Sequence, residues 1–306
     1  MEEELVVKYI KRKNKIRKIV TYADQSELRR YHEAVVDFLR KNTYDSIFAK
    51  AYVPKSSIYK NAEAHLYNDI FVKVDIKNFF PSINLKIMEK QLFKEISKNS
   101  EISRFECHEI VSKCSCSDIG LPLGLVSSPS LANIYLKEFD GILYGKLKKI
   151  NLDNPIYTRY ADDLVISFKA NNEYESIVAD IIKLIDELLS KYKLKRNKEK
   201  TQVVNINISN HVRITGVSVV KKEDGIRCIS VGRKTKNELF WKAIELYDAE
   251  KKDYPEIIRL KGMLSFVMSV EKRGIENTYS ANMMDMLNQR GAKSVKELIA
   301  LTEKQS

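Results

Sequence analysis

Apolar and polar residues alternate along residues 70–76, which predicts a β-strand. The segment reads IFVKVDI, so its four aliphatic side chains share one face of the strand. Lys73 and Asp75 lie on the opposite face, together with one phenylalanine. A strand that buries its aliphatic face therefore holds the carboxylate of Asp75 on its other face.

A second strand pattern surrounds two adjacent carboxylates. Residues 157–160 and 164–168 are rich in β-branched and aromatic side chains, which is typical of strands. Only Ala161, Asp162 and Asp163 separate them, so the pattern predicts a hairpin whose tip carries both carboxylates. Two aspartates at a turn are most often simply solvated. The apolar flanks and the third carboxylate on an upstream strand favour a functional site instead.

Apolar residues at helical spacing predict several helices, and further runs of strand-forming residues predict more strands. The expected helices cover residues 26–39, 84–97, 128–139, 174–193, 236–249, 255–270 and 282–302. The expected strands cover residues 5–22, with a turn at Lys13-Asn14, and residues 200–206 and 212–220. Ser127 precedes Ser128-Pro129, an arrangement that predicts an N-cap serine at the start of a helix.

The composition indicates a basic globular protein. The 306 residues are 44% hydrophobic, which is enough for a core and for more than one domain or lobe. Lysine and arginine number 53 against 41 aspartate and glutamate, so the formal net charge is +12. This excess suggests a polyanionic partner, although a merely basic soluble protein has the same composition. No apolar run approaches the roughly 20 residues that span a bilayer, so we expect a cytoplasmic protein with no membrane partner.

The cysteines do not favour a metal site. Cys107, Cys114 and Cys116 lie near His108, but their spacing matches no standard zinc module. We therefore expect reduced thiols, as is usual in the cytoplasm.

Three carboxylates on neighbouring strands point to divalent cations. Like charges repel, so a fold holds Asp75, Asp162 and Asp163 together most readily when cations bind beside them. Hard oxygen ligands without nearby cysteine or histidine favour Mg²⁺ or Mn²⁺ over zinc. Two such ions would lower the pKa of an attacking hydroxyl and neutralise charge on a leaving pyrophosphate. No Ser-His-Asp or Cys-His arrangement stands out, which favours in-line displacement at phosphorus.

Four motifs resemble those of reverse transcriptases and occur in that family's order. Residues 160–163 (YADD) resemble the YxDD box, and residues 75–83 (DIKNFFPSI) resemble the first catalytic motif. Residues 120–133, which contain GLPLG, SP and LAN, resemble the motif beneath the templating base pair. Residues 197–201 (NKEKT) resemble the lysine-bearing motif that follows. Together the four motifs span most of residues 70–220.

The resemblance implies an α+β fold in the shape of a right-hand polymerase. Such a fold has fingers, a palm with an antiparallel sheet backed by helices, and a helical thumb. We expect the fingers at residues 1–69 with part of 84–118, the palm at 70–232 and the thumb at 233–306. The implied activity is RNA-directed DNA polymerase, with dNTPs as substrates and an RNA/DNA hybrid as the bound nucleic acid.

The resemblance also implies which residues hold the metal ions. Asp75, Asp162 and Asp163 would be the catalytic residues and would bind two Mg²⁺ ions, with Mn²⁺ as the alternative. The backbone carbonyl of Ile76 would assist them.

Nucleotide-binding roles carry over to four more positions. Phe80 matches the steric gate that excludes a 2′-hydroxyl, and its spacing from Asp75 favours this role over that of a core phenylalanine. Gly124 lies in the loop beneath the nascent base pair, and Lys200 would approach the triphosphate unless it is only a solvated lysine. Arg17 lies where the family has basic residues that grip the triphosphate. Leu123 departs from the family's usual glutamine, which bears on fidelity and not on the metal chemistry.

Two further motifs resemble those of bacterial retron reverse transcriptases. Residues 61–65 (NAEAH) resemble the NAxxH box, and residues 214–216 (ITG) resemble the VTG box with isoleucine in place of valine. The resemblance implies a cognate structured noncoding RNA that is primed from a guanosine 2′-hydroxyl. The implied product is branched, RNA-linked DNA (msDNA), made for anti-phage defence together with an effector protein.

RNA-binding residues are expected in the NAxxH-like box at residues 61–65 and in the expected thumb. Asn61 and His65 are the expected contacts in the first, and Arg259 and Lys261 in the second. A helix segment with a stray histidine, and an ordinary amphipathic bundle with basic surface residues, would show the same patterns.

Other readings stay open at this point. The chain could be a different small bacterial reverse transcriptase, either group II intron-like or of the abortive-infection type with untemplated synthesis. It could also be an inactive RNA-binding scaffold on a polymerase fold. The presence of all three aspartates and of Phe80 argues against an inactive scaffold.

Overall fold

The computed structural model describes residues 5–12, 15–116, 120–251, 253–272 and 274–305. Its contacts divide the chain into two compact units. The first unit comprises Met1–Ser57 and Asn68–Asn205, and the second comprises Ile58–Tyr67 and Ile206–Ser306. The division into fingers, palm and thumb stays a prediction.

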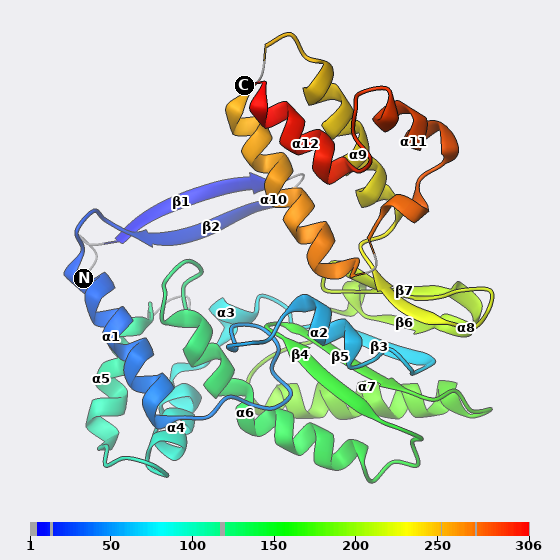
Figure 1. Cartoon of the computed structure of the whole chain (residues 1–306). Coiled ribbons are helices and arrows are strands. Elements are labelled where there is room, and N and C mark those ends of the chain that lie inside the picture. Colours follow the sequence, from blue (N-terminus) through cyan, green and yellow to red (C-terminus); the bar gives the residue numbers. More distant parts are fainter. Residues whose placement is uncertain (1–4, 13–14, 117–119, 252, 273, 306) are drawn as a thin grey trace. The chain divides into compact units, whose positions relative to one another are not determined.

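The described part of the first unit contains six strands and several helices, and Figure 1 shows their order along the chain. Its strands are β1 (Leu5–Arg12), β2 (Lys15–Tyr22), β3 (Ile70–Asp75), β4 (Ile156–Tyr160), β5 (Asp163–Phe168) and β6 (Gln202–Asn205). Its helices are α1 (Glu27–Asn42), α3 (Phe79–Ser82), α4 (Leu85–Ile96), α5 (Arg104–Cys114), α6 (Ser128–Leu147), α7 (Tyr174–Lys191) and the short 3₁₀-helix η2 (Lys198–Lys200).

The N-terminal strands form the predicted hairpin. β1 and β2 pair antiparallel along their whole length, from Leu5 opposite Tyr22 to Arg12 opposite Lys15. The predicted turn at Lys13-Asn14 lies outside the described residues.

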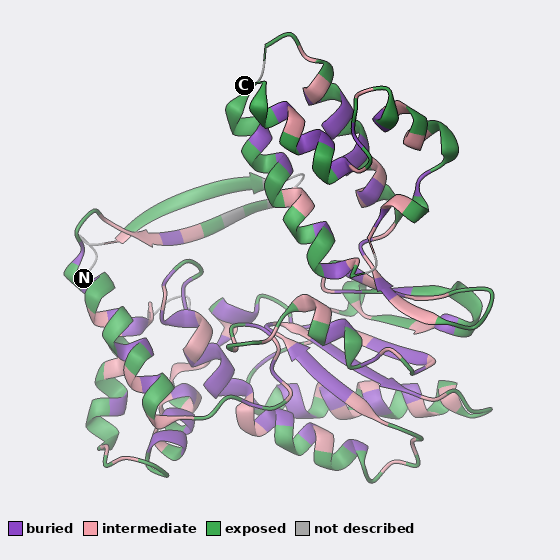
Figure 2. Ribbon diagram, in the orientation of Figure 1, coloured by how far each residue is buried: buried purple, intermediate pink, exposed green. Residues whose placement is uncertain are grey.

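The central sheet of the first unit has the strand order β4-β5-β3-β6, and every neighbouring pair is antiparallel. As predicted, the aliphatic face of β3 is buried, and it belongs to the same hydrophobic cluster as the buried stripes of α6 and α7. Figure 2 shows the continuous burial of the central strands. Phe71 on the opposite face is fully buried as well, so the sheet is covered on both sides at this end of β3. Asp75 lies at the other end of β3 and is 9% exposed.

The second unit combines a small sheet with a group of helices. Its strands are β7 (His211–Ile214), β8 (Val217–Lys221) and β9 (Arg227–Ser230), paired antiparallel in that order. Its helices are α2 (Ile58–Glu63), α8 (Ile206–Ser209), α9 (Arg233–Asp248), α10 (Tyr254–Val270), η3 (Glu276–Thr278), α11 (Ala281–Asn288) and α12 (Val295–Lys304).

The single strand predicted over residues 212–220 is wrong, because this segment is a hairpin. Thr215 and Gly216 both have positive φ, 44° and 97°, and a pair of such residues reverses the chain within two positions. β7 and β8 therefore pair with each other, and β9 extends the sheet.

The single C-terminal helix predicted over residues 282–302 is also wrong. α11 ends at Asn288, where Gly291 adopts a left-handed φ of 73° and the backbone N–H of Ala292 bonds to the carbonyl of Leu287. Such left-handed closure ends a helix. Ser294 then caps a new helix by accepting a hydrogen bond from the N–H of Glu297.

Ser127 occupies the predicted N-cap position of α6, but its side chain makes no capping hydrogen bond. The neighbouring Ser128 hydroxyl instead donates to the carbonyl of Pro122, at 2.7 Å. Ser128 therefore ties the preceding loop to the start of the helix.

None of the helices in the described part of the chain has both the length and the apolar composition that a bilayer crossing requires.

Candidate active site

The pairing of three strands brings the three aspartates to one edge of the central sheet. β3 and β5 are in a register that places Asp75 directly opposite Asp163. β4 and β5 place Tyr160 opposite Asp163, so the chain reverses through Ala161 and Asp162. The backbone N–H of residue 76 donates to the carbonyl of Asp162, at 2.9 Å. The predicted grouping of these residues therefore follows from strand register alone.

A buried ion pair supports the turn that carries the aspartates. Arg159 is fully buried and holds Asp140 of α6 with two nitrogens, Nε to Oδ1 at 2.9 Å and Nη2 to Oδ2 at 2.8 Å. The hydroxyl of Tyr157 donates to the same carboxylate, at 2.7 Å. Nη1 of Arg159 donates to Asn133 and, at 3.4 Å, to the carbonyl of Ala161, whose φ is 56°. This network holds the unfavourable left-handed backbone at the tip of the hairpin.

The crowding of negative charge is visible in Asp163. Partial burial, followed by the charges of Asp162 and Asp75, raises the pKa of this carboxyl to about 6, while Lys200 and Lys73 act in the opposite direction. A carboxyl whose pKa is raised by burial and by neighbouring negative charges favours a bound proton or a nearby cation.

This raised pKa predicts a pH-dependent stability difference in metal-free buffer. The unfolded chain ionises this group near its ordinary pKa of 3.8 and the folded chain near 6, so the folded state loses stability as pH rises between these values. Replacing Asp163 with asparagine should therefore stabilise the protein by about 1–2 kcal/mol more at pH 8 than at pH 4, after allowance for partial solvent exposure. Urea unfolding in EDTA at both pH values measures it.

The exposed Asp180 on α7 provides the matched control, because Asp180→Asn changes the same chemical group away from the cluster. If the two substitutions changed the free energy of unfolding equally at both pH values, the raised pKa could not be assigned to Asp163.

Lys200 contacts a carboxylate in this structure. Its Nζ lies 2.5 Å from Oδ1 of Asp75, while half of its side chain stays exposed. Asn197 adds a second clamp, since its Nδ2 donates to Oδ2 of Asp75 at 3.1 Å and its backbone N–H donates to the Asp75 carbonyl at 2.8 Å. The motif at residues 197–201 therefore places the ammonium group of Lys200 beside Asp75. The approach of Lys200 to a triphosphate stays a prediction.

The donor set fits magnesium or manganese by its chemistry. Within the described ranges, no three His, Cys, Asp or Glu side chains converge closely enough to hold one metal ion as they stand. Asp75 instead holds Lys200, so its carboxylate would exchange this partner for an ion. Three hard oxygen donors at one end of the sheet favour divalent cations, and so do the burial and the neighbouring negative charges that raise the pKa of Asp163.

Phe80 lies at the start of α3, a few residues after Asp75 at the end of β3. It is 8% exposed against 2% for Phe79, and the two rings contact each other at 5.3 Å between centroids. The ring of Tyr52 packs edge-on against Phe80 at 6.5 Å, and Tyr52 itself is 55% exposed. Burial raises the pKa of Tyr52, and the nearby charge of Asp162 raises it further. Tyr52 is thus an additional aromatic residue at the edge of the site.

The glycines of the loop at residues 120–124 let its backbone pack closely against other backbone segments. A Cβ on Gly120 would lie 2.7 Å from the carbonyl oxygen of Ile83, and a Cβ on Gly124 would lie 2.3 Å from that of Val20. Both glycines have positive φ, and the Leu123 carbonyl accepts the N–H of Val20 in β2. Gly124 therefore holds the N-terminal hairpin against the loop, and its predicted contact with nucleotide stays a prediction.

Arg17 lies in β2 opposite Ile10, but its side chain lies outside the described residues. Its predicted contact with a triphosphate stays a prediction.

The expected RNA contacts differ in their placement within the second unit. Asn61 and His65 are fully buried, and Nδ2 of Asn61 donates to the hydroxyl of Thr215, at 3.2 Å. The NAEAH and ITG motifs therefore pack against each other, and both side chains contact protein in this structure. On α10, Arg259 is largely exposed, whereas Lys261 pairs with Glu303 of α12 at 2.8 Å.

The sequence reasoning missed four residues of the site, because each acts through a partner distant in sequence. These residues are Tyr52, Asp140, Arg159 and Asn197. A usable signal existed for Asp140, which interrupts the apolar stripe of a long helix and so requires a buried partner.

Comparison with protein families finds a model that matches most of the chain. The family model described as "Reverse transcriptase (RNA-dependent DNA polymerase)" matches residues 10–261. This range contains all the predicted catalytic and nucleotide-binding residues.

Curated relatives carry a more specific description. The chain is 31% identical over 176 residues to the Retron Ec73 reverse transcriptase of Escherichia coli, a match that covers 56% of this chain and 55% of that protein. It is 27% identical over 255 residues to the Retron Ec86 reverse transcriptase of Escherichia coli, covering 82% and 72% respectively. The predicted resemblance to bacterial retron reverse transcriptases is confirmed. The first of these matches spans just over half the length of the relative.

Solved structures support the fold. The apo telomerase from Candida Tropicalis superposes with a TM-score of 0.54 at 14% identity, covering 92% of this chain and 59% of that one. A form truncated from its C-terminal domain gives a TM-score of 0.51 at 15% identity, with 70% and 52% coverage. At these identities the likeness concerns the fold alone, and the predicted α+β polymerase fold is confirmed.

Proposed function

The chain belongs to the reverse transcriptase (RNA-dependent DNA polymerase) family, and we propose that it copies a structured RNA into DNA by metal-assisted nucleotidyl transfer. The observation that carries this proposal is the strand register that sets Asp75 opposite Asp163. The carbonyl of Asp162 also accepts a hydrogen bond from the backbone N–H of Ile76, the residue after Asp75. A site of this kind needs positioning and charge and no protein nucleophile.

The residues of the chain have separate roles in this proposal. Asp75, Asp162 and Asp163 would hold two divalent ions, Mg²⁺ or Mn²⁺, with the Ile76 carbonyl assisting. When bound, the ions would activate the primer hydroxyl and neutralise the departing pyrophosphate. Lys200 neutralises Asp75 in the structure, and once that carboxylate binds an ion, the ammonium group is available to the triphosphate.

We propose that Phe80 selects the sugar of the incoming nucleotide. Its ring is packed between Phe79 and Tyr52, so it has little freedom to move away from a ribose. A ring fixed in this way would exclude a 2′-hydroxyl and select dNTPs.

We further infer that the enzyme is a retron reverse transcriptase that makes branched, RNA-linked DNA. The support is the direct contact between the two retron-like motifs, with Asn61 bonded to Thr215, together with the names of the curated relatives. A cognate noncoding RNA as template and primer, and an effector protein in anti-phage defence, belong to the same proposal. The basic excess of +12 suits a protein that holds RNA.

The nucleic acid that co-purifies with the protein from its native-locus host tests this proposal. We expect a short DNA that is shortened or shifted in mobility by debranching enzyme and whose RNA part is removed by RNase. RNA alone, with primer extension on an added template in Mg²⁺, would contradict the retron assignment and leave another type of reverse transcriptase. The absence of both nucleic acid and extension would favour the inactive scaffold.

A further inference from the structure

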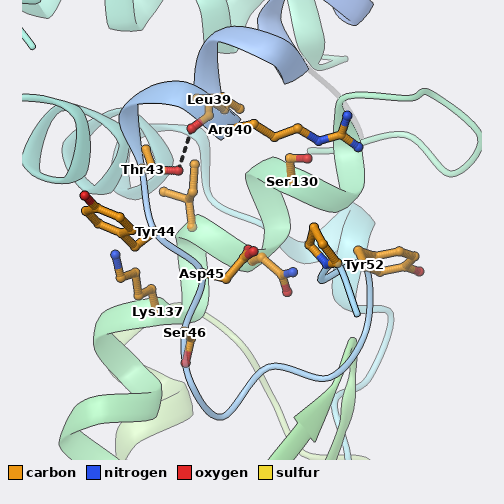
Figure 3. A pocket seen from close by; sticks show the side chains of 12 residues that line it. Leu39, Arg40, Thr43, Tyr44, Asp45, Ser46, Tyr52, Ser130 and Lys137 are labelled. Carbon is orange, nitrogen blue, oxygen red and sulfur yellow. Dashed lines mark hydrogen bonds between the residues drawn. The ribbon is translucent and has the colours of Figure 1, made fainter. Parts of the chain in front are cut away.

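A pocket in the first unit adjoins the proposed nucleotide site but shares no catalytic residue with it. Its volume is about 190 Å³, and it is formed by the end of α1, the segment that follows it, and α6 (Figure 3). A cavity of about 150 Å³ can accommodate a benzene ring, so this pocket has room for a planar base. The Tyr52 ring lines the pocket and also packs against Phe80, so one side chain separates the two places.

The lining combines the groups that recognise an unpaired nucleotide. Asp45 lies between two tyrosines, Tyr44 and Tyr52, which are 75% and 55% exposed (Figure 3). Exposed aromatic rings offer stacking surfaces for bases. Arg40 and Lys137 lie at the same pocket and supply positive charge for a phosphate.

Asp45 is an exposed residue whose carboxylate lines the pocket. The structure gives its carboxylate no hydrogen bond and no ion pair among the described residues. Partial burial raises its pKa, while Lys137, Arg159 and Arg40 lower it from a distance. A carboxylate accepts hydrogen bonds with both oxygens, so it would pair best with a ligand that offers two adjacent donors.

The floor of the pocket is rigid. Asn133 is 5% exposed, and its amide is used on both sides, since Oδ1 accepts from Arg159 and Nδ2 donates to the carbonyl of Ala51. Leu39 and Ile134 are buried beside it. A floor held by buried hydrogen bonds lowers the entropic cost of receiving a ligand.

The positive charge suits one phosphate better than a triphosphate. Lys137 already pairs with Glu95, and Arg40 lies 3.7 Å from Asp37, so both cations are partly neutralised. A free nucleoside triphosphate carries several negative charges and would meet too little compensation here. A nucleotide within a strand brings a single bridging phosphate.

We propose that this pocket receives an unpaired nucleotide of the RNA template next to the copied position, with guanine preferred. Among the four bases, guanine alone presents two adjacent Watson–Crick donors, N1–H and the 2-amino group, to the two oxygens of Asp45. The proposal rests on the proposed function, because it requires that an RNA template passes the site.

The test measures equilibrium affinity without catalysis. RNA templates annealed to a DNA primer, with 5′ RNA overhangs of zero to four nucleotides, are titrated in EDTA and followed by fluorescence anisotropy. Relative to the blunt template, the overhang that reaches the pocket should increase affinity about tenfold when it places guanine there. The increase should be smaller when it places uridine there. Inosine in place of that guanine lacks the 2-amino group and should lose about fivefold, which requires no change in the protein.

Protein variants assign the effect to the pocket. Asp45→Asn should abolish the preference for guanine, and Arg40→Gln should weaken all overhangs equally. Arg30→Gln is the matched control, since Arg30 is an exposed arginine of α1 outside the pocket lining. Thermal melts of each variant confirm that it folds.

Three results would overturn the proposal. They are equal affinity for blunt and overhanging templates, an unchanged guanine preference in Asp45→Asn, and saturable binding of free GMP with no effect of the overhang. Single-nucleotide incorporation in Mg²⁺ by the wild type is measured in parallel. If the wild type incorporates no nucleotide, the proposed function is contradicted. The anisotropy measurements alone decide whether the pocket binds a template nucleotide.

Discussion

Replacing Asp162 and Asp163 together with asparagine should lower the rate of RNA-templated DNA synthesis by about 10³-fold or more. The substitution keeps the shape of both side chains but removes two negative charges from a cluster of three. Metal-assisted displacement depends on those charges, and 10³-fold corresponds to about 4 kcal/mol of activation free energy. Primer extension on an RNA template in Mg²⁺ measures the loss.

RNA affinity separates catalysis from binding in the same variant. We expect the dissociation constant for RNA to change by less than about threefold, because backbone phosphates are held by basic residues elsewhere. Asp180→Asn, an exposed change on α7, should leave both synthesis and binding as in the wild type. Full synthesis by the double variant would contradict the assignment of these carboxylates to the metal ions.

Replacing Arg159 with methionine should destabilise the protein by about 3–5 kcal/mol. The variant leaves Asp140 charged and fully buried with only the hydroxyl of Tyr157 as a partner. An uncompensated buried charge has a cost of this size. Synthesis should fall as well, because the carbonyl of Ala161 at the tip of the aspartate hairpin loses its donor.

Two controls test the physical reason. Arg290 pairs with Asp248 with comparable two-point geometry, at 2.8 and 2.6 Å, but Asp248 is 46% exposed, so Arg290→Met should cost only about 1 kcal/mol. The double change Arg159→Met with Asp140→Leu should recover much of the lost stability, since it removes both charges. Urea unfolding at neutral pH measures all three variants. A cost for Arg159→Met no larger than that for Arg290→Met would show that burial is not decisive.

Local pattern was sufficient where one short stretch decides the outcome. The alternation at residues 70–76 predicted β3 and the face that carries Asp75. The paired runs around Asp162 predicted the hairpin of β4 and β5. Both features depend on side-chain periodicity within a few residues, so no distant partner is needed to read them.

Pattern failed where backbone conformation interrupts a continuous apolar run. The left-handed turn at Thr215-Gly216 splits one predicted strand into two, and Gly291 splits one predicted helix into two. Apolar residues resume within a few positions of each break, at Val217 and at Val295, so in each place two apolar runs resemble one continuous element. The chain reverses through the positive φ angles of Thr215, Gly216 and Gly291.

The sequence by itself determined the family, the three aspartates and the strands that carry them, because the motifs concentrate that chemistry in short segments. Only the tertiary structure decided that Asp75 lies opposite Asp163, that Lys200 neutralises Asp75, and that Arg159 meets Asp140. It also decided that Asn61 is buried against Thr215. Each of these contacts joins residues 19 to 154 positions apart, and their meeting depends on packing that no local pattern encodes.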